Sequence, residues 1–111
     1  MGSSKGSNLG EFEEIVLLVV GTLTGNAYTV EIRRFIIDEI GRNVNISAIH
    51  EVLKRLEKKG FVTSELGGAT QERGGRRKKL FQLTTYGKTA IIESRATRNE
   101  LFARIPNISQ A

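Results

Sequence analysis

The chain has no cysteine and no tryptophan, and it contains one histidine and one proline among its 111 residues. The absence of cysteine excludes disulfides, thiol nucleophiles and thiolate metal sites. A single histidine cannot build a metal site of the usual kinds, so we expect neither a metal nor another cofactor. No pair of acids accompanies a nucleophile in a catalytic arrangement, and we therefore expect that the protein is not an enzyme.

Long hydrophobic runs are also missing. The longest apolar run covers residues 15–20, whereas a membrane span needs roughly 20 residues. Residues 1–8 are polar, and we expect them to be flexible, with no apolar signal-peptide core after them. Together with the lack of cysteine, this predicts a cytoplasmic protein. A chain of this length, 39% hydrophobic, is expected to form one domain.

Residues 45–59 are predicted to form an amphipathic helix. Asn45 or Ser47 can cap its start, because a short side-chain oxygen accepts the free backbone N–H groups of the first turn. Gly60 ends the helix, since glycine takes the left-handed conformation at no steric cost. Apolar residues recur along one face at helical spacing, namely Ile46, Ile49, Leu53 and Leu56.

A β-hairpin is expected to follow this helix. Residues 61–66 are predicted to form one strand and residues 80–83 its return partner. Between them, residues 67–79 read GGATQERGGRRKK, two glycine pairs with a run of basic side chains. A helix followed by a hairpin with a basic tip is the plan of a winged helix. The helix would lie in a DNA major groove, and the wing would contact the backbone or the minor groove.

The positive charge belongs to this part of the chain. The formal net charge is +5, from 17 Lys and Arg against 12 Asp and Glu. Residues 54–79 hold nine basic and three acidic residues, whereas the remainder has eight basic and nine acidic residues. A polyanion is the natural partner of such a segment, because each phosphate that a cation neutralises releases a counterion. The alternative is a solvated basic loop with no particular partner.

Three further helices complete the predicted fold. The first covers residues 9–23, the second covers 27–40 and ends at Gly41, and the last covers 85–104 after a Thr84 cap. The fold class is therefore mostly α with a small β-hairpin, in the order helix, helix, helix, strand, strand, helix. It is a winged helix-turn-helix domain over residues 9–83, followed by a C-terminal dimerisation helix over 84–105 and a tail over 106–111.

The first and last helices carry more apolar surface than a small core needs. The first is either central to the monomer or partly in contact with another chain. The far end of the last helix is best explained by packing on a partner chain. The predicted dimer interface comprises Phe12, Val16, Val19, Val20, Leu101, Phe102 and Ile105.

The predicted DNA contacts come from the third helix and the wing, because the first turn of a recognition helix normally reaches base edges. His50 is either such a contact or an ordinary helix residue, and Arg33 or Arg34 is either a phosphate contact or solvated. The full prediction is Asn45, Ser47, Ala48, His50, Glu51, Lys54 and Arg55 in the helix, with Arg73, Arg76, Arg77 and Lys78 in the wing. The alternative is a winged helix that binds RNA or a protein, although the narrow A-form groove suits such a helix poorly.

With these residues in view, the chain resembles the PadR family of bacterial transcriptional regulators over about residues 9–92. The most specific part is the glycine-arginine wing followed by a Leu-Thr pair and a glycine, in ERGGRRKKLFQLTTYGK. The spacing of this wing from Gly60 adds to the resemblance. The other matching segments are LGEFEEIVLLVVGTL, GNAYTVEIRRFIIDEIG and NISAIHEVLKRLEKKGFV.

This resemblance implies a homodimer that binds a partly palindromic operator, usually as a repressor. In such proteins the C-terminal helix of one subunit packs against the N-terminal helix of the other. His50 stands where family members commonly carry tyrosine, so no operator preference is carried over. Some short members bind flat apolar drugs between tryptophans at the dimer centre. The absence of tryptophan here weakens the expectation of a small apolar ligand at that place.

Overall fold

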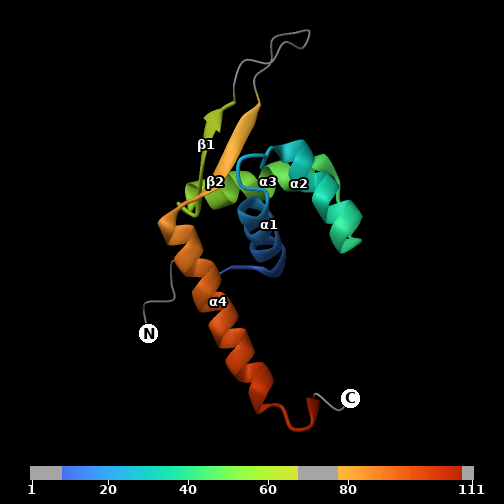
Figure 1. The fold of residues 1–111 in the computed structure, drawn as a ribbon, viewed down its shortest axis with the longest axis vertical. Coiled ribbons are helices and arrows are strands. Elements are labelled where there is room, and N and C mark those ends of the chain that lie inside the picture. The colour runs from blue at the N-terminus through green and yellow to red at the C-terminus, as the bar shows by residue number, and fades with distance from the viewer. Residues whose placement is uncertain (1–8, 68–77, 109–111) are drawn as a thin grey trace.

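The computed structural model describes residues 9–67 and 78–108. Within them, helices and a hairpin follow one another in the predicted order, and the predicted fold class is confirmed (Figure 1). The elements are α1 (Glu11–Thr22), α2 (Thr29–Phe35), the π-helical turn η2 (Ile36–Ile40), α3 (Ile46–Lys58), β1 (Val62–Leu66), β2 (Lys79–Leu83) and α4 (Thr85–Arg104).

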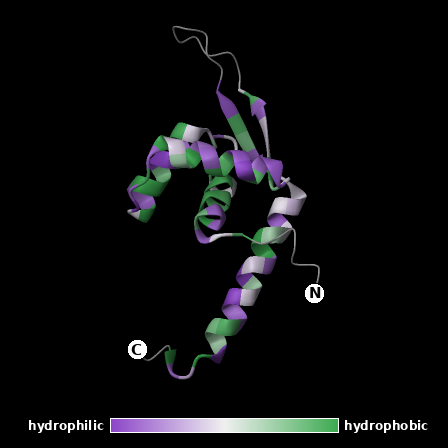
Figure 2. Ribbon diagram, turned by 180° about the vertical axis from the view of Figure 1, so that it is seen from behind, coloured by the Kyte–Doolittle hydropathy of each residue, from purple (hydrophilic) through white to green (hydrophobic). Residues whose placement is uncertain are grey.

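The hydrophobic core lies between the three N-terminal helices and the base of the hairpin. Helix α1 runs through its middle and contacts α2, α3, β2 and α4. In Figure 2, α1 is apolar over most of its length, whereas α4 alternates between polar and apolar residues. The largest fully buried side chains are Phe61, Leu17, Ile32, Ile36, Ile49, Leu53, Leu56, Val16, Val20 and Val62.

Val16, Val19 and Val20, which the sequence assigns to a dimer interface, form part of the core of the single chain. Each is at most 3% exposed in the single chain, because α2, α3 and β2 pack around α1. A side chain that its own chain already covers offers no surface to a partner. Phe12 is only half-buried, with the Arg42 guanidinium carbon 5.1 Å from its ring centroid, and its interface role stays a prediction.

The second predicted helix is shorter and less regular than expected. Its α-helical part begins at Thr29, and its last turn is the π-helix η2. It ends at Gly41, whose φ of 75° is left-handed as predicted. Tyr28, which lies within the predicted helix, precedes α2 in extended conformation and bridges to Leu80. The start of α2 is thereby held against the hairpin.

Helix α3 begins and ends as its sequence indicates. The Asn45 side chain caps it by accepting a hydrogen bond from the Ala48 backbone N–H, at 2.9 Å. Gly60 follows it with a φ of 86°. The predicted apolar face is buried at Ile49, Leu53 and Leu56, together with Val52, whereas Ile46 is 36% exposed.

The two strands pair antiparallel, with Val62 opposite Leu83 and Ser64 opposite Phe81. The Phe81 backbone N–H also donates to the Ala27 carbonyl oxygen at 3.0 Å, which joins the hairpin to the residues before α2. The base of the wing is therefore fixed on the domain, next to α2. Residues 68–77, which include most of the predicted wing tip, lie outside the described residues.

Helix α4 starts on the core and then leaves it (Figure 1). Thr84 caps it, accepting from the Gly87 N–H at 2.9 Å and donating to the Gly60 carbonyl oxygen at 2.7 Å. Gly87 and Ala90 are its buried residues, and most of the positions from Ile92 onward are exposed. Of the helices in the described part of the chain, none combines the length and apolar character that crossing a membrane requires.

Candidate nucleic-acid interface

The outer face of α3 presents the polar side chains that the sequence predicts to read DNA. Ser47, His50, Glu51 and Lys54 are all exposed, and their spacing places them on one side of the helix. The opposite side is buried in the core through Ile49, Leu53 and Leu56. Ala48 is half-buried, and the Asn45 side chain is engaged in capping. The helix thus offers a continuous polar face to a partner.

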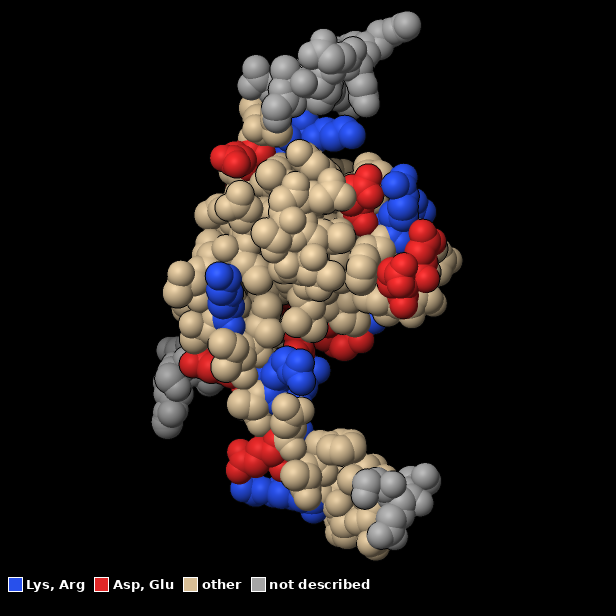
Figure 3. Space-filling model, in the orientation of Figure 1, with Lys and Arg blue, Asp and Glu red and all other residues tan. Residues whose placement is uncertain are grey.

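A hollow of about 570 Å³ lies beside this face, between α3, the start of α2 and β2. It brings Lys54 of the helix together with Lys78 and Lys79 at the start of β2. In Figure 3, basic side chains are visible at this end of the hairpin, next to the residues drawn in grey. The residues that line it are Tyr28, Thr29, Val30, Ile46, His50, Leu53, Lys54, Glu57, Lys78, Lys79 and Phe81.

The contribution of α2 to this hollow was missed from the sequence. Tyr28, Thr29 and Val30 line it, and the Lys78 ammonium lies 5.9 Å from the centroid of the Tyr28 ring. At that distance a cation is attracted to the face of the ring, which helps to hold Lys78 at the edge of the hollow. The segment containing Tyr28 carries part of the family resemblance, but its position beside the wing depends on tertiary packing.

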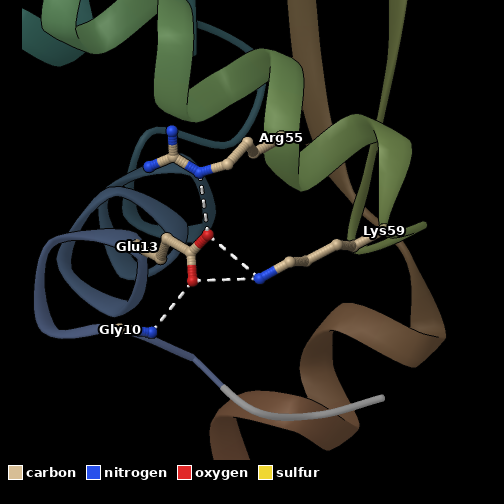
Figure 4. Close-up of polar contacts among 4 residues, drawn as sticks. All are labelled: Gly10, Glu13, Arg55 and Lys59. Carbon is tan, nitrogen blue, oxygen red and sulfur yellow. Dashed lines mark hydrogen bonds and ion pairs between the residues drawn. The ribbon is translucent and has the colours of Figure 1, made fainter. Parts of the chain in front are cut away.

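Arg55 is directed away from this hollow. Its Nε donates to Glu13 Oε2 at 3.2 Å, and Lys59 Nζ donates to the two Glu13 oxygens at 3.2 and 3.0 Å (Figure 4). The Gly10 backbone N–H donates to the same carboxylate at 2.9 Å. Glu13 therefore ties the C-terminal half of α3 to the first turn of α1, and we leave Arg55 out of the proposed DNA contacts.

The two arginines of α2 also have partners within the chain. Arg33 Nε donates to the Val44 carbonyl oxygen at 2.9 Å, and Arg34 lies 3.3 Å from Glu31. The Arg33 contact holds the connection between α2 and α3. Three of the predicted wing contacts, Arg73, Arg76 and Arg77, lie outside the described residues. The fourth, Lys78, lies within them.

The acidic first turn of α1 joins three other parts of the chain. These carboxylates complement the positive end of the helix dipole, and each also pairs with a distant cation. Glu11 lies 2.8 Å from Arg42, Glu13 pairs with Arg55 and Lys59, and Glu14 lies 3.0 Å from Arg98 of α4. The Glu14–Arg98 pair is close but is not aligned as a hydrogen bond. Pairings at such separations give no local signal in the sequence.

We expect Glu13→Gln to lower the free energy of unfolding at neutral pH by about 1–3 kcal/mol, because a nearly buried acceptor loses its charge-assisted bonds. Burial alone would raise the pKa of Glu13, but the Gly10 N–H, Lys59 and Arg55 outweigh it and hold this pKa below its usual value. The stabilisation is therefore complete above the ordinary carboxyl pKa of about 4.3 and is lost as the pH falls through the lower pKa of the folded protein.

Urea denaturation of the wild-type protein and Glu13→Gln, from pH 7 down to pH 3, measures this effect. The difference between the two proteins should shrink on the acid side. Glu93→Gln, which removes an exposed carboxylate from α4, is the matched control and should change stability little. A difference for Glu13→Gln that stays constant across the pH range would contradict the role of its charge.

Among residues 9–67 and 78–108, no three His, Asp or Glu side chains gather in a way that could hold a metal ion. The described face instead combines a polar helix surface, a hollow with lysines at its edge, and the base of a hairpin. With the order of helices and strands, this defines a winged-helix protein.

The comparison with protein families identifies the family of winged-helix proteins to which the chain belongs. Residues 16–93 match the model of the transcriptional regulator PadR-like family. The chain therefore belongs to the PadR-like family of transcriptional regulators, and the resemblance seen in the sequence is confirmed. None of the curated protein sequences is significantly similar to the chain.

Solved structures show the same fold. A PadR-like transcription factor from Bacteroides fragilis has a TM-score of 0.73 and 24% identity, over 87% of this chain and 88% of that one. A PadR family regulator from Eggerthella lenta has a TM-score of 0.65 and 24% identity, over 82% and 79%. Bacillus subtilis PadR in complex with operator DNA has a TM-score of 0.62 and 22% identity, over 78% of this chain and 47% of that one.

Proposed function

We propose that the protein is a cytoplasmic, homodimeric repressor that binds a partly palindromic operator in duplex DNA. The outer face of α3 enters the major groove, and the wing contacts the backbone or the minor groove. The observation that carries this proposal is the hollow that Lys54 of α3 lines together with Lys78 and Lys79 of the wing. A related fold is known in complex with operator DNA, in Bacillus subtilis PadR.

The dimer is supported by the far end of α4. Leu101, Phe102 and Ile105 are 57%, 56% and 47% exposed in the single chain. Three large apolar side chains within five residues are costly to leave half exposed, because fully burying one such side chain contributes about 1.5–3 kcal/mol. We propose that this end of α4 packs on a second copy of the chain, near Phe12 at the start of α1.

Selection of duplexes from a random DNA pool tests the function. We expect enrichment of two inverted half-sites with a fixed spacing, because a two-fold symmetric dimer reads a symmetric site. The mass of the complex, measured by sedimentation, should correspond to two chains on one duplex. Enrichment of a single unpaired half-site would contradict the dimer, and enrichment of no sequence would contradict an operator-binding role.

Lys78→Ala is expected to weaken binding to all DNA sequences and to reduce the slope of log affinity against log salt by about one unit, as one phosphate contact is lost. Arg76→Ala should have the same effect. Lys88→Ala, which removes an exposed cation from α4, is the matched control and should leave the slope unchanged. Titration of labelled operator and scrambled duplexes at several salt concentrations gives the slopes. An unchanged slope for both wing variants would exclude their phosphate contacts.

A further inference from the structure

Two exposed aliphatic side chains line the proposed DNA-binding hollow. Ile46 is 36% exposed and Val30 is 49% exposed, and both border the hollow together with His50 and Lys54. Neither belongs to the hydrophobic core. The rest of this face carries hydroxyl, imidazole and ammonium groups, so its aliphatic groups require an explanation. Phosphates alone would offer these side chains no apolar surface to contact and would leave them exposed to water.

The position of Ile46 on α3 indicates what it meets. It is the first residue of the helix, directly after the Asn45 cap, and the first turn of a recognition helix is the part that reaches base edges. An aliphatic side chain forms no hydrogen bond. Of the groups that base pairs present in the major groove, the 5-methyl group of thymine is the apolar one, and it is read by contact with apolar side chains.

We propose that Ile46 recognises a thymine in each operator half-site through the 5-methyl group of the base, and that Ile46 is thus a specificity-determining residue. This inference rests on the proposed function and deepens it. Val30 lines the same hollow from α2, so the methyl group would approach a recess with aliphatic side chains contributed by two elements. His50 and Lys54, on the polar face, remain available to hydrogen-bond neighbouring bases or phosphates.

Ala48 is the other apolar residue in the first turn and is the natural competitor for this role. Its side chain is one methyl group, and the residue is half-buried. Its backbone N–H is also held by the Asn45 cap at 2.9 Å, which fixes it against the helix start. Ile46 is longer and lines the hollow, as Ala48 does not. The geometry therefore favours Ile46.

Replacing each thymine of the selected operator by deoxyuridine tests the inference, since this removes the methyl group and keeps every hydrogen-bonding group of the base. For the wild-type protein, we expect one position in each half-site at which the change weakens binding about fourfold, the equivalent of about one buried methylene group. The Ile46→Ala variant should bind the thymine and deoxyuridine operators equally. Ile46→Val, which keeps a branched aliphatic side chain, should retain most of the preference.

Three results would overturn the inference. One is that no deoxyuridine position weakens binding by the wild-type protein while selective binding persists, and another is that Ile46→Ala retains the full thymine preference. In both cases the proposed function as an operator-binding regulator would not be contradicted. Absence of any selective binding would overturn the proposed function and this inference together. Circular dichroism of Ile46→Ala should show a native melting transition, because the residue lies outside the core.

Discussion

Gly87→Ala is expected to destabilise the fold by about 3 kcal/mol, at the upper end of the usual cost of overpacking a well-packed site. A Cβ atom at this position would lie 2.1 Å from the Phe61 carbonyl oxygen and 3.0 Å from its carbonyl carbon. These are backbone atoms, so no flexible side chain can move aside. For a domain of this size, the melting temperature should fall by about 10–20 °C.

The surroundings of Gly87 leave little room for relaxation. The Phe61 carbonyl oxygen accepts from the Thr84 backbone N–H at 3.1 Å, and the Phe61 side chain is fully buried. Moving α4 away would therefore break the hydrogen bonds that Thr84 donates to the Gly60 and Phe61 carbonyl oxygens, and it would open the core. Gly10→Ala is the control, since a Cβ atom there meets the Glu13 carboxylate at an ordinary 3.7 Å. Equal thermal stability of Gly87→Ala and the wild-type protein would contradict the close packing of α4 on Phe61.

Lys54→Glu is expected to weaken binding to the selected operator about 100-fold, because a like charge brought against phosphates costs several kcal/mol and each tenfold loss corresponds to about 1.4 kcal/mol. Lys54 is exposed on the outer face of α3 and lines the same hollow as Lys78 and Lys79. The variant places a carboxylate at the centre of the proposed contact surface. Fluorescence anisotropy with a labelled operator at fixed salt measures the loss.

Net charge alone must be separated from this local effect. Lys88→Glu changes the net charge of the chain by the same amount, but its position is an exposed site on α4, outside the hollow. We expect it to weaken binding only a few-fold, since distant exposed charges are screened by salt. Similar losses for both variants would mean that the charge of the whole protein, and not the α3 face, governs binding.

Local chemistry explains why so much of the fold could be predicted from the sequence. Asn45 and Thr84 accept backbone N–H groups at the helix starts, as short side-chain oxygens do. Gly41 and Gly60 take left-handed conformations at helix ends. Each of these signals acts within a few residues, so the sequence alone contains it. The fold class and the order of elements follow from them.

Contacts between distant segments explain what the sequence could not predict. The pattern of α1 showed a broad apolar face, but only packing shows that Val16, Val19 and Val20 are covered by the chain itself. From the sequence, Arg55 is available on α3 to contact DNA, but in the structure it donates a hydrogen bond to Glu13, which lies 42 residues away in the chain. For the same reason the sequence did not reveal that Tyr28 and Val30 border the hollow between α3 and the wing.

The most direct test of the account is binding to a DNA fragment of about 200 base pairs from upstream of the protein's own gene, against a scrambled fragment, at several salt concentrations. Our account predicts selective binding by a dimer, with an affinity that falls steeply as salt rises. A footprint on the selective fragment would then identify the operator. Equal, weak binding to both fragments, together with tighter binding to RNA or to a protein partner, would contradict the proposal that α3 reads duplex DNA.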